Sequence, residues 1–440
     1  MRVNSSMTSH TRWLRRRELL AAAGAAALGS TPLSAHLPAQ AAGPPPTSSS
    51  PGRVPIPPTP DLANLYDTIH WIGKQNEPGL SFLGSRWKDL EEWKQQARPT
   101  FHRCLDYYPK PEPLSAELVN RERRDGFTLE AVKIRATAAY QIPAWVLIPD
   151  NLKGRVPGLV AIHDHGGAYV WGHEKIISYP GENPALTEYR NTYYGRPYAE
   201  LLARKGYVVL VIDGFYFGER RLRPEEIDVA TAPGEMRQGL QKLSTTKTNS
   251  REWISAVNQL CHQYESLTAK TIFTAGATWP GILVWDDMRS VDYLCSRPEV
   301  DATRIGCLGL SIGGLRTAYL IAADPRIKVA CVTGWMTEFE AQLRNYLRSH
   351  TWMVYIPGLY SSLDLPDAAS MTAPGALLVQ QCDRDELYPA DGMKRAVEKL
   401  NKIYAKAGIP DRFRGLFYDV GHSFRPGMQD DAFAWIEKWI

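Results

Sequence analysis

The chain has 440 residues, of which 44% are hydrophobic and 22% charged, and this composition predicts a soluble globular protein with one large domain or at most two. The formal net charge is +4, but residues 1–41 contain five Arg and one Glu, so the rest of the chain has 46 basic and 46 acidic residues. A neutral remainder has no basic field with which to bind nucleic acid or an anionic membrane, and this slightly favours a catalytic protein.

The cysteine pattern gives no support to a zinc or redox motif. None of the six cysteines belongs to a Cys-x-x-Cys pair. Cys307 and Cys331 fall within predicted strands, where we expect small buried apolar side chains. The sequence does not decide whether Cys104, Cys261 or Cys295 form disulfides.

The N-terminus has the organisation of an export signal. Residues 15–20 contain an Arg-Arg-x-Leu-Leu core, residues 21–28 are Ala-rich and mildly hydrophobic, and residues 39–41 have the small-x-small pattern of a cleavage site. We therefore expect residues 1–41 to be a twin-arginine-type signal peptide that exports the protein to the periplasm or the exterior. An uncleaved membrane anchor is the alternative, but the apolar run is well short of the roughly 20 residues that a span needs.

Two segments of different character follow the signal. Residues 42–60 are rich in Pro, Gly and Ser and predict a disordered linker. Residues 61–120 show mixed helical periodicity and no pattern of catalytic residues. We expect them to form a helical N-terminal extension that caps the main domain.

From Phe127 onwards, predicted strands alternate with predicted helices. Residues 128–135 and 144–148 predict an antiparallel pair at a sheet edge. Residues 157–162 and 207–212 are nearly continuous apolar runs, which are typical of strands covered on both faces. The order predicts an α/β protein with a mostly parallel central sheet covered by helices on both faces. Neither a Gly-x-x-x-x-Gly-Lys-Ser/Thr motif nor a Gly-x-Gly-x-x-Gly motif is present, which counts against a nucleotide-binding fold.

A His-Asp-His-Gly-Gly segment follows the strand at 157–162. His163 and His165 have the spacing of two ligands on one face of a strand, but no third metal ligand stands at a recognisable distance, so we do not predict a metal site. The favoured interpretation is a loop that offers a backbone N–H to a substrate oxyanion, where glycine lets the backbone itself contact the oxygen. Gly167 or Gly166 would donate, and the sequence does not separate them.

Two long insertions are predicted. Residues 215–280 are polar and poorly periodic, and residues 335–370 are rich in aromatic side chains, so we expect both to be lids or caps. The aromatic residues could stack on a sugar ring, but ordinary packing of a small cap is favoured. Between the insertions, residues 285–294 predict a helix, and we expect its charges, including Asp286 and Asp287, to form a solvated face or cap contacts.

Residues 305–314 are the stretch around which the rest is organised. Gly309-Leu310-Ser311-Ile312-Gly313 matches the Gly-x-Ser-x-Gly nucleophile elbow, a sharp strand-to-helix turn that exposes the serine Oγ at the end of a sheet. The amide of Ile312, at the start of the following helix, can then face a developing oxyanion. A glycine-rich turn without chemistry is the alternative for this short motif. Further strands are predicted at 327–332, 375–381 and 413–418, with helices at 393–404 and 433–440.

The partners of Ser311 are sought in the order Ser, acid, His. His422 is the only histidine beyond Gln380, and it follows the last predicted strand. The acid should follow the strand at 375–381, where Asp385 precedes Pro389 by four residues. We favour Asp385 over Asp383, with Glu386 third, as the carboxylate that orients the imidazole.

Together these motifs resemble the α/β-hydrolase superfamily, in the branch of acetyl xylan esterase-like and dienelactone hydrolase-like proteins. The resemblance covers about residues 125–440 and implies one α/β-hydrolase domain over 61–440, with an N-terminal helical cap and lid insertions. Ser311 stands where dienelactone hydrolases have a cysteine, which counts against lactone specificity. The residues that carry the resemblance are His163 to Gly167, Trp285-Asp286-Asp287, Pro298 to Asp301 with Arg304 to Gly306, Gly309 to Gly314, Asp385 and Gly421-His422.

The resemblance implies a serine hydrolase that cleaves carboxylic esters, often acetyl groups on carbohydrates, without a metal or a cofactor. We expect a small-molecule or carbohydrate ester as the substrate, no nucleic-acid partner and no stable membrane insertion after signal cleavage; the oligomeric state is open. A serine peptidase or amidase of the prolyl oligopeptidase type is one alternative, but residues 61–120 are too short for its usual propeller domain. The other is a catalytically silent carbohydrate-binding protein of the same fold, against which the complete set of Ser, acid and His argues.

Overall fold

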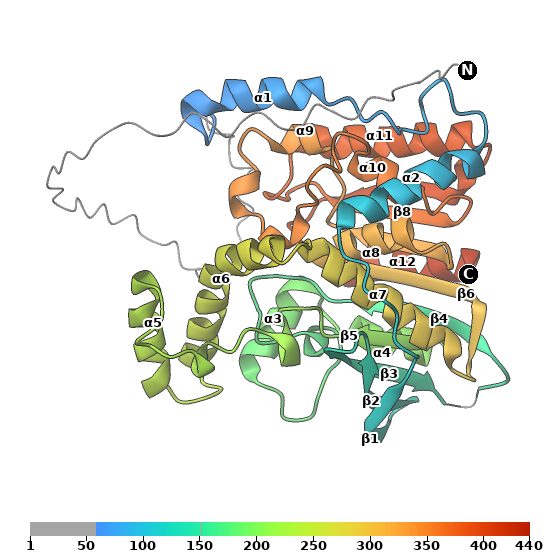
Figure 1. Cartoon of the computed structure of the whole chain (residues 1–440). Helices are drawn as coiled ribbons and strands as arrows, with labels where there is room; N and C mark the ends of the chain where they lie inside the picture. Colours follow the sequence, from blue (N-terminus) through green and yellow to red (C-terminus); the bar gives the residue numbers. More distant parts are fainter. Residues whose placement is uncertain (1–58, 151) are drawn as a thin grey trace, which may run out of the picture. The chain divides into compact units, whose positions relative to one another are not determined.

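In the computed structural model, which describes residues 59–150 and 152–440, nine strands form one sheet in the order β1-β2-β3-β5-β4-β6-β7-β8-β9 (Figure 1). The predicted signal peptide and almost all of the predicted linker lie outside the described residues. The strands are β1 (Ala116–Arg124), β2 (Phe127–Arg135), β3 (Gln141–Pro149), β4 (Val156–Ile162), β5 (Val208–Ile212), β6 (Val300–Leu310), β7 (Ile327–Thr333), β8 (Ala376–Cys382) and β9 (Phe413–Tyr418).

The larger part of the sheet is parallel. Six neighbouring strands of the sheet, β5, β4, β6, β7, β8 and β9, pair in parallel. The strands β1, β2 and β3 form an antiparallel meander, and β3 pairs antiparallel with β5. The predicted mostly parallel sheet is therefore confirmed. Because parallel strands end at the same edge of a sheet, the loops after β4, β6, β7, β8 and β9 all emerge on one side.

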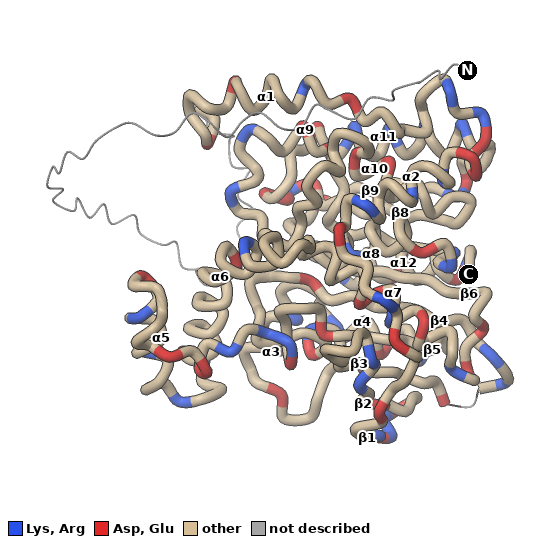
Figure 2. The backbone as a smooth tube through the Cα atoms, viewed as in Figure 1, with Lys and Arg blue, Asp and Glu red and all other residues tan. Residues whose placement is uncertain are grey.

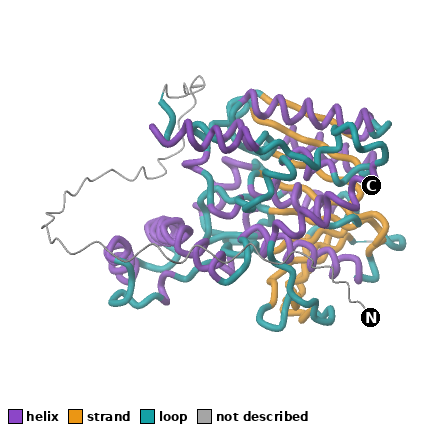
Figure 3. Tube along the Cα trace, turned by 45° about the horizontal axis from the view of Figure 1, so that its top comes forward, coloured by secondary structure: helices purple, strands orange, loops and turns teal. Residues whose placement is uncertain are grey.

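Helices cover both faces of the sheet (Figures 1 and 3). Alternate residues of β5 belong to different hydrophobic clusters. Val208 and Leu210 belong to the cluster that includes residues of α2, α7, α8 and α11, and Val209 and Val211 belong to the cluster that includes residues of α4 and α12. A strand buried on both faces needs apolar side chains at every position, which explains the continuous apolar run at 207–212.

The helices run from α1 to α12, with short 3-10 helices between them. The α-helices are α1 (Tyr66–Gln75), α2 (Leu90–Leu105), α3 (Pro184–Tyr193), α4 (Tyr198–Arg204), α5 (Gly234–Thr245), α6 (Arg251–Thr274), α7 (Trp279–Ser296), α8 (Ile312–Ala323), α9 (Phe339–Gln342), α10 (Leu365–Ser370), α11 (Ala390–Lys406) and α12 (Pro426–Trp439). The 3-10 helices are η1 (Ala63–Leu65), η2 (His173–Lys175), η3 (Gly218–Arg220), η4 (Pro224–Glu226), η5 (Leu347–Ser349), η6 (Trp352–Val354) and η7 (Pro410–Arg412).

Two segments differ from what the sequence predicts. The helical extension expected over 61–120 ends earlier, because residues 116–120 belong to β1, the true edge strand beside β2. All but the last side chain of β1 are exposed, so this strand lacks the apolar alternation that would mark it in the sequence. The insertion at 215–280, which shows little periodicity in the sequence, is largely helical and contains α5 and the 24-residue helix α6.

Charged residues of both signs are interspersed along the described backbone (Figure 2). Among the described residues, no helix is both long enough and apolar enough to cross a membrane.

Candidate active site

Ser311 lies between β6 and α8 with a strained backbone. Its φ of 59° and ψ of −122° place a residue with a side chain in a region that glycine usually occupies. The Ser311 amide donates a hydrogen bond of 2.9 Å to the carbonyl oxygen of Thr333, the last residue of β7. Neighbouring strands therefore hold the sharp turn in place.

The glycines of the motif allow close contact between the elbow and β4. A Cβ atom on Gly313 would lie 2.5 Å from the carbonyl oxygen of Ile162, and one on Gly309 would lie 2.6 Å from the backbone of Gly313. Any side chain at either position would force the backbones apart. The elbow is consequently pressed against the end of β4, from which the His-Asp-His-Gly-Gly segment begins.

His422 is hydrogen-bonded to Asp385. His422 Nδ1 lies 2.6 Å from Asp385 Oδ2, and Asp385 Oδ1 accepts the amide of Leu387 at 2.9 Å. Burial lowers the pKa of His422, but the charge and hydrogen bond of Asp385, with a smaller contribution from Asp164, outweigh burial and raise the pKa above its usual value. The bond also assigns the proton to Nδ1, which leaves the lone pair of a neutral imidazole on Nε2.

Asp383 has different surroundings. Its amide donates to the carbonyl oxygen of Tyr418, the last residue of β9, at 2.8 Å, and its side chain is exposed. Of the two aspartates that the sequence offers, Asp385 is the one bonded to His422.

His422 lies beside the end of β7, the strand whose last residue, Thr333, accepts the Ser311 amide. A Cβ atom on Gly334, the residue after Thr333, would be 3.2 Å from Cε1 of the His422 ring. The buried Nε2 of His422 has no hydrogen-bond partner among the described residues, Ser311 Oγ included. Catalytic hydrogen bonds of this kind are often formed only when the substrate is bound, so a free Nε2 suits a general base.

The His165–Ala168 segment forms a tight turn. The Ala168 amide donates to the His165 carbonyl oxygen at 3.1 Å, and the φ angles of Gly166 and Gly167 are 52° and 68°. Both φ values are positive, as a type I′ turn requires, and glycine adopts them without strain. The Gly167 amide donates to His165 Nδ1 at 3.0 Å, so it is already engaged within the loop.

The other oxyanion candidate, Ile312, is the first residue of α8. The first amides of an α-helix have no acceptor within the helix. The Ile312 amide is thus available at the position that the sequence predicts for it.

The two histidines before the glycines serve separate networks. His163 is fully buried, and its Nε2 lies 3.1 Å from the Gly214 amide that it accepts. His165 Nε2 lies 3.1 Å from Glu265 Oε1 on α6. They therefore do not converge on one point, as two ligands of a shared metal would.

Glu265 is a residue that the sequence analysis missed. Its buried carboxylate accepts hydrogen bonds from the Tyr169 hydroxyl (2.6 Å), the Thr351 hydroxyl (2.8 Å) and the Trp352 amide (3.2 Å), in addition to His165. These hydrogen bonds lower the pKa of Glu265, although burial alone would raise it. Glu265 thereby ties the glycine loop to both insertions. A signal exists in the sequence, because Glu265 interrupts an i, i+4 stripe of buried residues, namely Val257, Cys261 and Ala269.

Asp286 and Asp287 are buried, and the expectation of a solvated face is wrong. Asp287 accepts a forked pair of hydrogen bonds from Arg316 on α8, from Nε at 3.0 Å and from Nη2 at 2.5 Å. Asp286 pairs with Arg220 at 2.6 Å and accepts the Tyr140 hydroxyl at 2.9 Å. Since the arginines lie far away in the sequence, helical periodicity alone could not indicate that these charges are paired.

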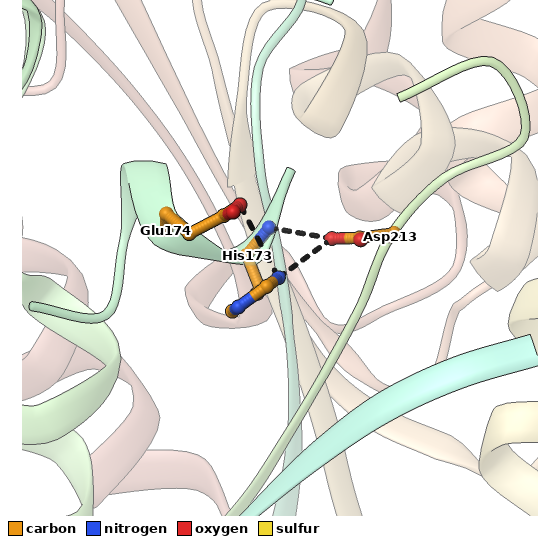
Figure 4. A group of neighbouring side chains, drawn as sticks. All are labelled: His173, Glu174 and Asp213. Carbon is orange, nitrogen blue, oxygen red and sulfur yellow. Dashed lines mark hydrogen bonds and ion pairs between the residues drawn. The ribbon is translucent and has the colours of Figure 1, made fainter. Parts of the chain in front are cut away.

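A second group of charged side chains lies on η2 and directly after β5 (Figure 4). His173 Nδ1 lies 2.9 Å from Asp213 Oδ1 and 3.3 Å from Glu174 Oε2. Their ligand atoms are close enough together to hold a metal ion. However, Asp213 also accepts the His173 amide at 2.7 Å and the Glu219 amide at 2.8 Å. These side chains therefore already form a network of ion pairs and hydrogen bonds with one another and with the backbone, and this network fixes η2 against the end of β5.

One aromatic side chain, Tyr388 after β8, lies near His422 and packs against Trp335, the first residue of the second insertion. The Tyr388 ring lies 5.2 Å from Trp335 and 6.4 Å from His422, measured between centroids. The buried Trp335 Nε1 and Tyr388 Oη have no hydrogen-bond partner among the described residues. Buried polar groups normally find partners, so these two are candidates to bind polar groups of a substrate.

The chain is similar in sequence or in structure to several known proteins. No family model matches the chain. The chain is 24% identical over 348 residues to the Bacillus subtilis (strain 168) protein named "Putative hydrolase YtaP", a match that covers 79% of this chain and 100% of that protein. Among solved structures, a "putative acetyl xylan esterase" of Bacteroides fragilis superposes with a TM-score of 0.59 at 18% identity, covering 80% of this chain and 82% of its own.

A glucuronoyl esterase of Solibacter usitatus superposes with a TM-score of 0.54 at 14% identity, covering 82% of this chain and 96% of its own. At identities this low, the superpositions establish the fold alone. The α/β-hydrolase fold predicted from the motifs is confirmed.

Proposed function

We propose that the chain is a serine hydrolase that cleaves carboxylic esters through Ser311, His422 and Asp385. The observation that carries the proposal is the 2.6 Å hydrogen bond between His422 Nδ1 and Asp385 Oδ2, with the second ring nitrogen free beside the strand end that holds the Ser311 elbow. A serine hydroxyl is a weak nucleophile unless a base removes its proton, and this histidine supplies the base.

The first half of the reaction makes an acyl-enzyme. His422 Nε2 takes the hydroxyl proton of Ser311 while Oγ bonds to the ester carbonyl carbon, whose oxygen becomes an oxyanion. The Ile312 amide and an amide of the glycine loop donate hydrogen bonds to that oxyanion. The bond from the carbonyl carbon to the alcohol oxygen then breaks, and the departing alcohol takes the proton from His422.

The second half releases the acid. A water molecule gives a proton to His422 Nε2 and its oxygen attacks the acyl carbon. The tetrahedral species collapses with cleavage of the bond to Ser311 Oγ, which regains the proton from His422. Asp385 stabilises the imidazolium in both halves, because its carboxylate accepts the Nδ1–H.

An acetyl ester of a carbohydrate is the substrate class that we propose. The names of the similar structures, an acetyl xylan esterase and a glucuronoyl esterase, support an ester of a carbohydrate. The unpartnered Trp335 Nε1 and Tyr388 Oη would offer hydrogen bonds to sugar hydroxyls. No metal or cofactor takes part in this mechanism.

Substitution Ser311→Ala tests the proposal. We expect a folded protein that no longer hydrolyses p-nitrophenyl acetate and no longer reacts with a fluorophosphonate probe. Wild-type activity in Ser311→Ala would refute the assignment. Faster cleavage of an aminoacyl-proline anilide than of acetyl esters would instead indicate a peptidase, and a wild-type protein inert to both substrates and to the probe would indicate a silent binding protein.

We also propose that residues 1–41 export the folded protein by the twin-arginine route and are then removed, leaving no stable membrane insertion. The Arg-Arg-x-Leu-Leu core supports this proposal. Fusion of residues 1–41 to a reporter protein tests it, since replacement of Arg16 and Arg17 by Lys should abolish export. Export that is unchanged by this double substitution would contradict the twin-arginine route.

A further inference from the structure

A buried lysine lies beneath the glycine loop. Lys175, the last residue of η2, is fully buried, and its Nζ donates hydrogen bonds to the carbonyl oxygens of Asp164 (2.8 Å) and His165 (2.9 Å). Burial lowers the pKa of Lys175 to about 8, although the negative charges of Asp164, Glu174 and Asp213 act to raise it. The ammonium group is therefore still charged at neutral pH, and it points at two successive peptide groups of the loop.

The segment that carries Lys175 is itself firmly held. His173, two residues earlier, is bonded to Asp213 at the end of β5 (Figure 4). Arg190 on α3 donates to the carbonyl oxygens of Glu174 at 2.6 Å and of Lys175 at 3.3 Å. Because η2 is fixed from both sides, the position of the Lys175 ammonium group is fixed relative to the loop.

The peptide group between His165 and Gly166 links this lysine to the site. In a planar trans peptide the C=O and N–H bonds point in opposite directions. Since the His165 carbonyl points inward at Lys175, the Gly166 N–H points away from the buried lysine. Among the described residues the Gly166 amide has no acceptor, whereas the Gly167 amide is bonded to His165 Nδ1.

A side chain at position 166 would collide with its neighbours. A Cβ atom there would lie 1.8 Å from the Tyr189 hydroxyl oxygen and 2.6 Å from Asp164 Oδ2, whereas a Cβ atom on Gly167 would meet nothing within 4 Å. The loop is thus packed tightly at Gly166 and loosely at Gly167. A donor that must not move during catalysis is expected at the tightly packed position.

We propose that Lys175 is a positioning residue of the oxyanion hole, and that its ammonium group holds the His165–Gly166 peptide so that the Gly166 amide, rather than that of Gly167, faces the oxyanion. This inference rests on the proposed hydrolase function. The positive charge on the carbonyl side polarises the same peptide group, which makes its N–H a stronger donor.

A structure of the wild-type protein with a trifluoromethyl ketone bound covalently to Ser311 tests the choice of amide. The adduct carries an oxyanion where the tetrahedral intermediate would carry it. We expect that oxygen within hydrogen-bond distance of the Ile312 and Gly166 amides, with Gly167 still bonded to His165. Contact of the oxygen with the Gly167 amide in place of Gly166 would overturn the inference, although the hydrolase function would stand. No adduct at Ser311 would overturn both.

Substitution Lys175→Met tests the role of the lysine. We expect kcat to fall by on the order of 100-fold, as for loss of one oxyanion donor, with KM changed by less than about threefold. Inhibition by the trifluoromethyl ketone should weaken by the same factor as kcat/KM. The control is Lys406→Met, because Lys406 also donates to two backbone carbonyl oxygens, those of Phe82 and Gly84, but away from the site.

A folded Lys175→Met protein with wild-type kcat would refute the positioning role. A rise in KM alone would do the same, because it would place the effect on substrate binding instead of on the oxyanion. If the variant does not fold, the adduct structure of the wild-type protein still decides the matter.

Discussion

Asp385 and His422 come from loops that follow two adjacent parallel strands, β8 and β9, and share a 2.6 Å hydrogen bond. Substitution Asp385→Asn should lower kcat by about 10³- to 10⁴-fold, because an amide cannot accept the Nδ1 proton as a carboxylate does and leaves His422 in the wrong tautomer. Steady-state kinetics with p-nitrophenyl acetate would measure the loss. Asp383→Asn is the matched control, and we expect it to retain activity within about twofold; equal losses would contradict the assignment.

The pH dependence of kcat/KM should report His422. The general base works only when neutral, so activity should rise as the pH increases through the pKa of His422. Burial lowers this pKa, but Asp385 outweighs burial, so the midpoint of the acid limb should lie above the ordinary histidine value of about 6.5. Asp385→Asn should move the midpoint to lower pH. A midpoint that is the same in both proteins would show that another group titrates.

The strained backbone of Ser311 should be visible in stability. Its φ of 59° costs energy for any residue with a Cβ atom, and glycine would relieve that cost. Glycine also lowers the stability by about 1 kcal/mol, because it gives the unfolded chain more conformational freedom. The relief of strain exceeds this loss, so we expect Ser311→Gly to be about 1 kcal/mol more stable than Ser311→Ala. Urea unfolding of both inactive variants would measure the difference. Higher stability of the alanine variant would argue against strain at the elbow.

The ion pair of Arg316 and Asp287 holds α8 against α7 behind the elbow. Substitution Arg316→Met would leave Asp287 buried and unpaired, which typically costs about 3–5 kcal/mol. The double substitution Arg316→Met with Asp287→Leu should recover most of that loss, because no uncompensated charge remains. Urea unfolding of the single and double variants would test this, and additive losses would contradict it.

Glu265 should stabilise the two insertions jointly. Substitution Glu265→Ala leaves buried donors on Tyr169, Thr351 and His165 without an acceptor, and we expect a loss of about 3 kcal/mol or more. Hydrogen exchange should increase in the glycine loop and at residues 351–352 together. Glu252→Ala on the exposed side of the same helix is the control and should change stability by less than about 0.5 kcal/mol. Faster exchange confined to α6 would show that Glu265 does not link the segments.

Residue patterns predicted the elements that depend on local chemistry. The parallel strands are recognisable because burial on both faces requires continuous apolar runs, such as residues 207–212. The elbow is recognisable because Gly309 and Gly313 must lack side chains where β4 and α8 meet. By contrast, β1 carries exposed side chains on its edge and leaves no such pattern.

The sequence by itself determined the fold class and a short set of candidates: Ser311, His422, two aspartates and two glycines. Only the tertiary structure shows which aspartate is bonded to His422, because Asp385 and Asp383 differ in the loop geometry that turns one carboxylate to the imidazole. It likewise decided that Asp286 and Asp287 are buried, since their arginine partners come from other elements. A hydrogen bond between residues far apart in the chain has no local pattern, so only the folded arrangement brings Glu265 and Lys175 beneath the glycine loop.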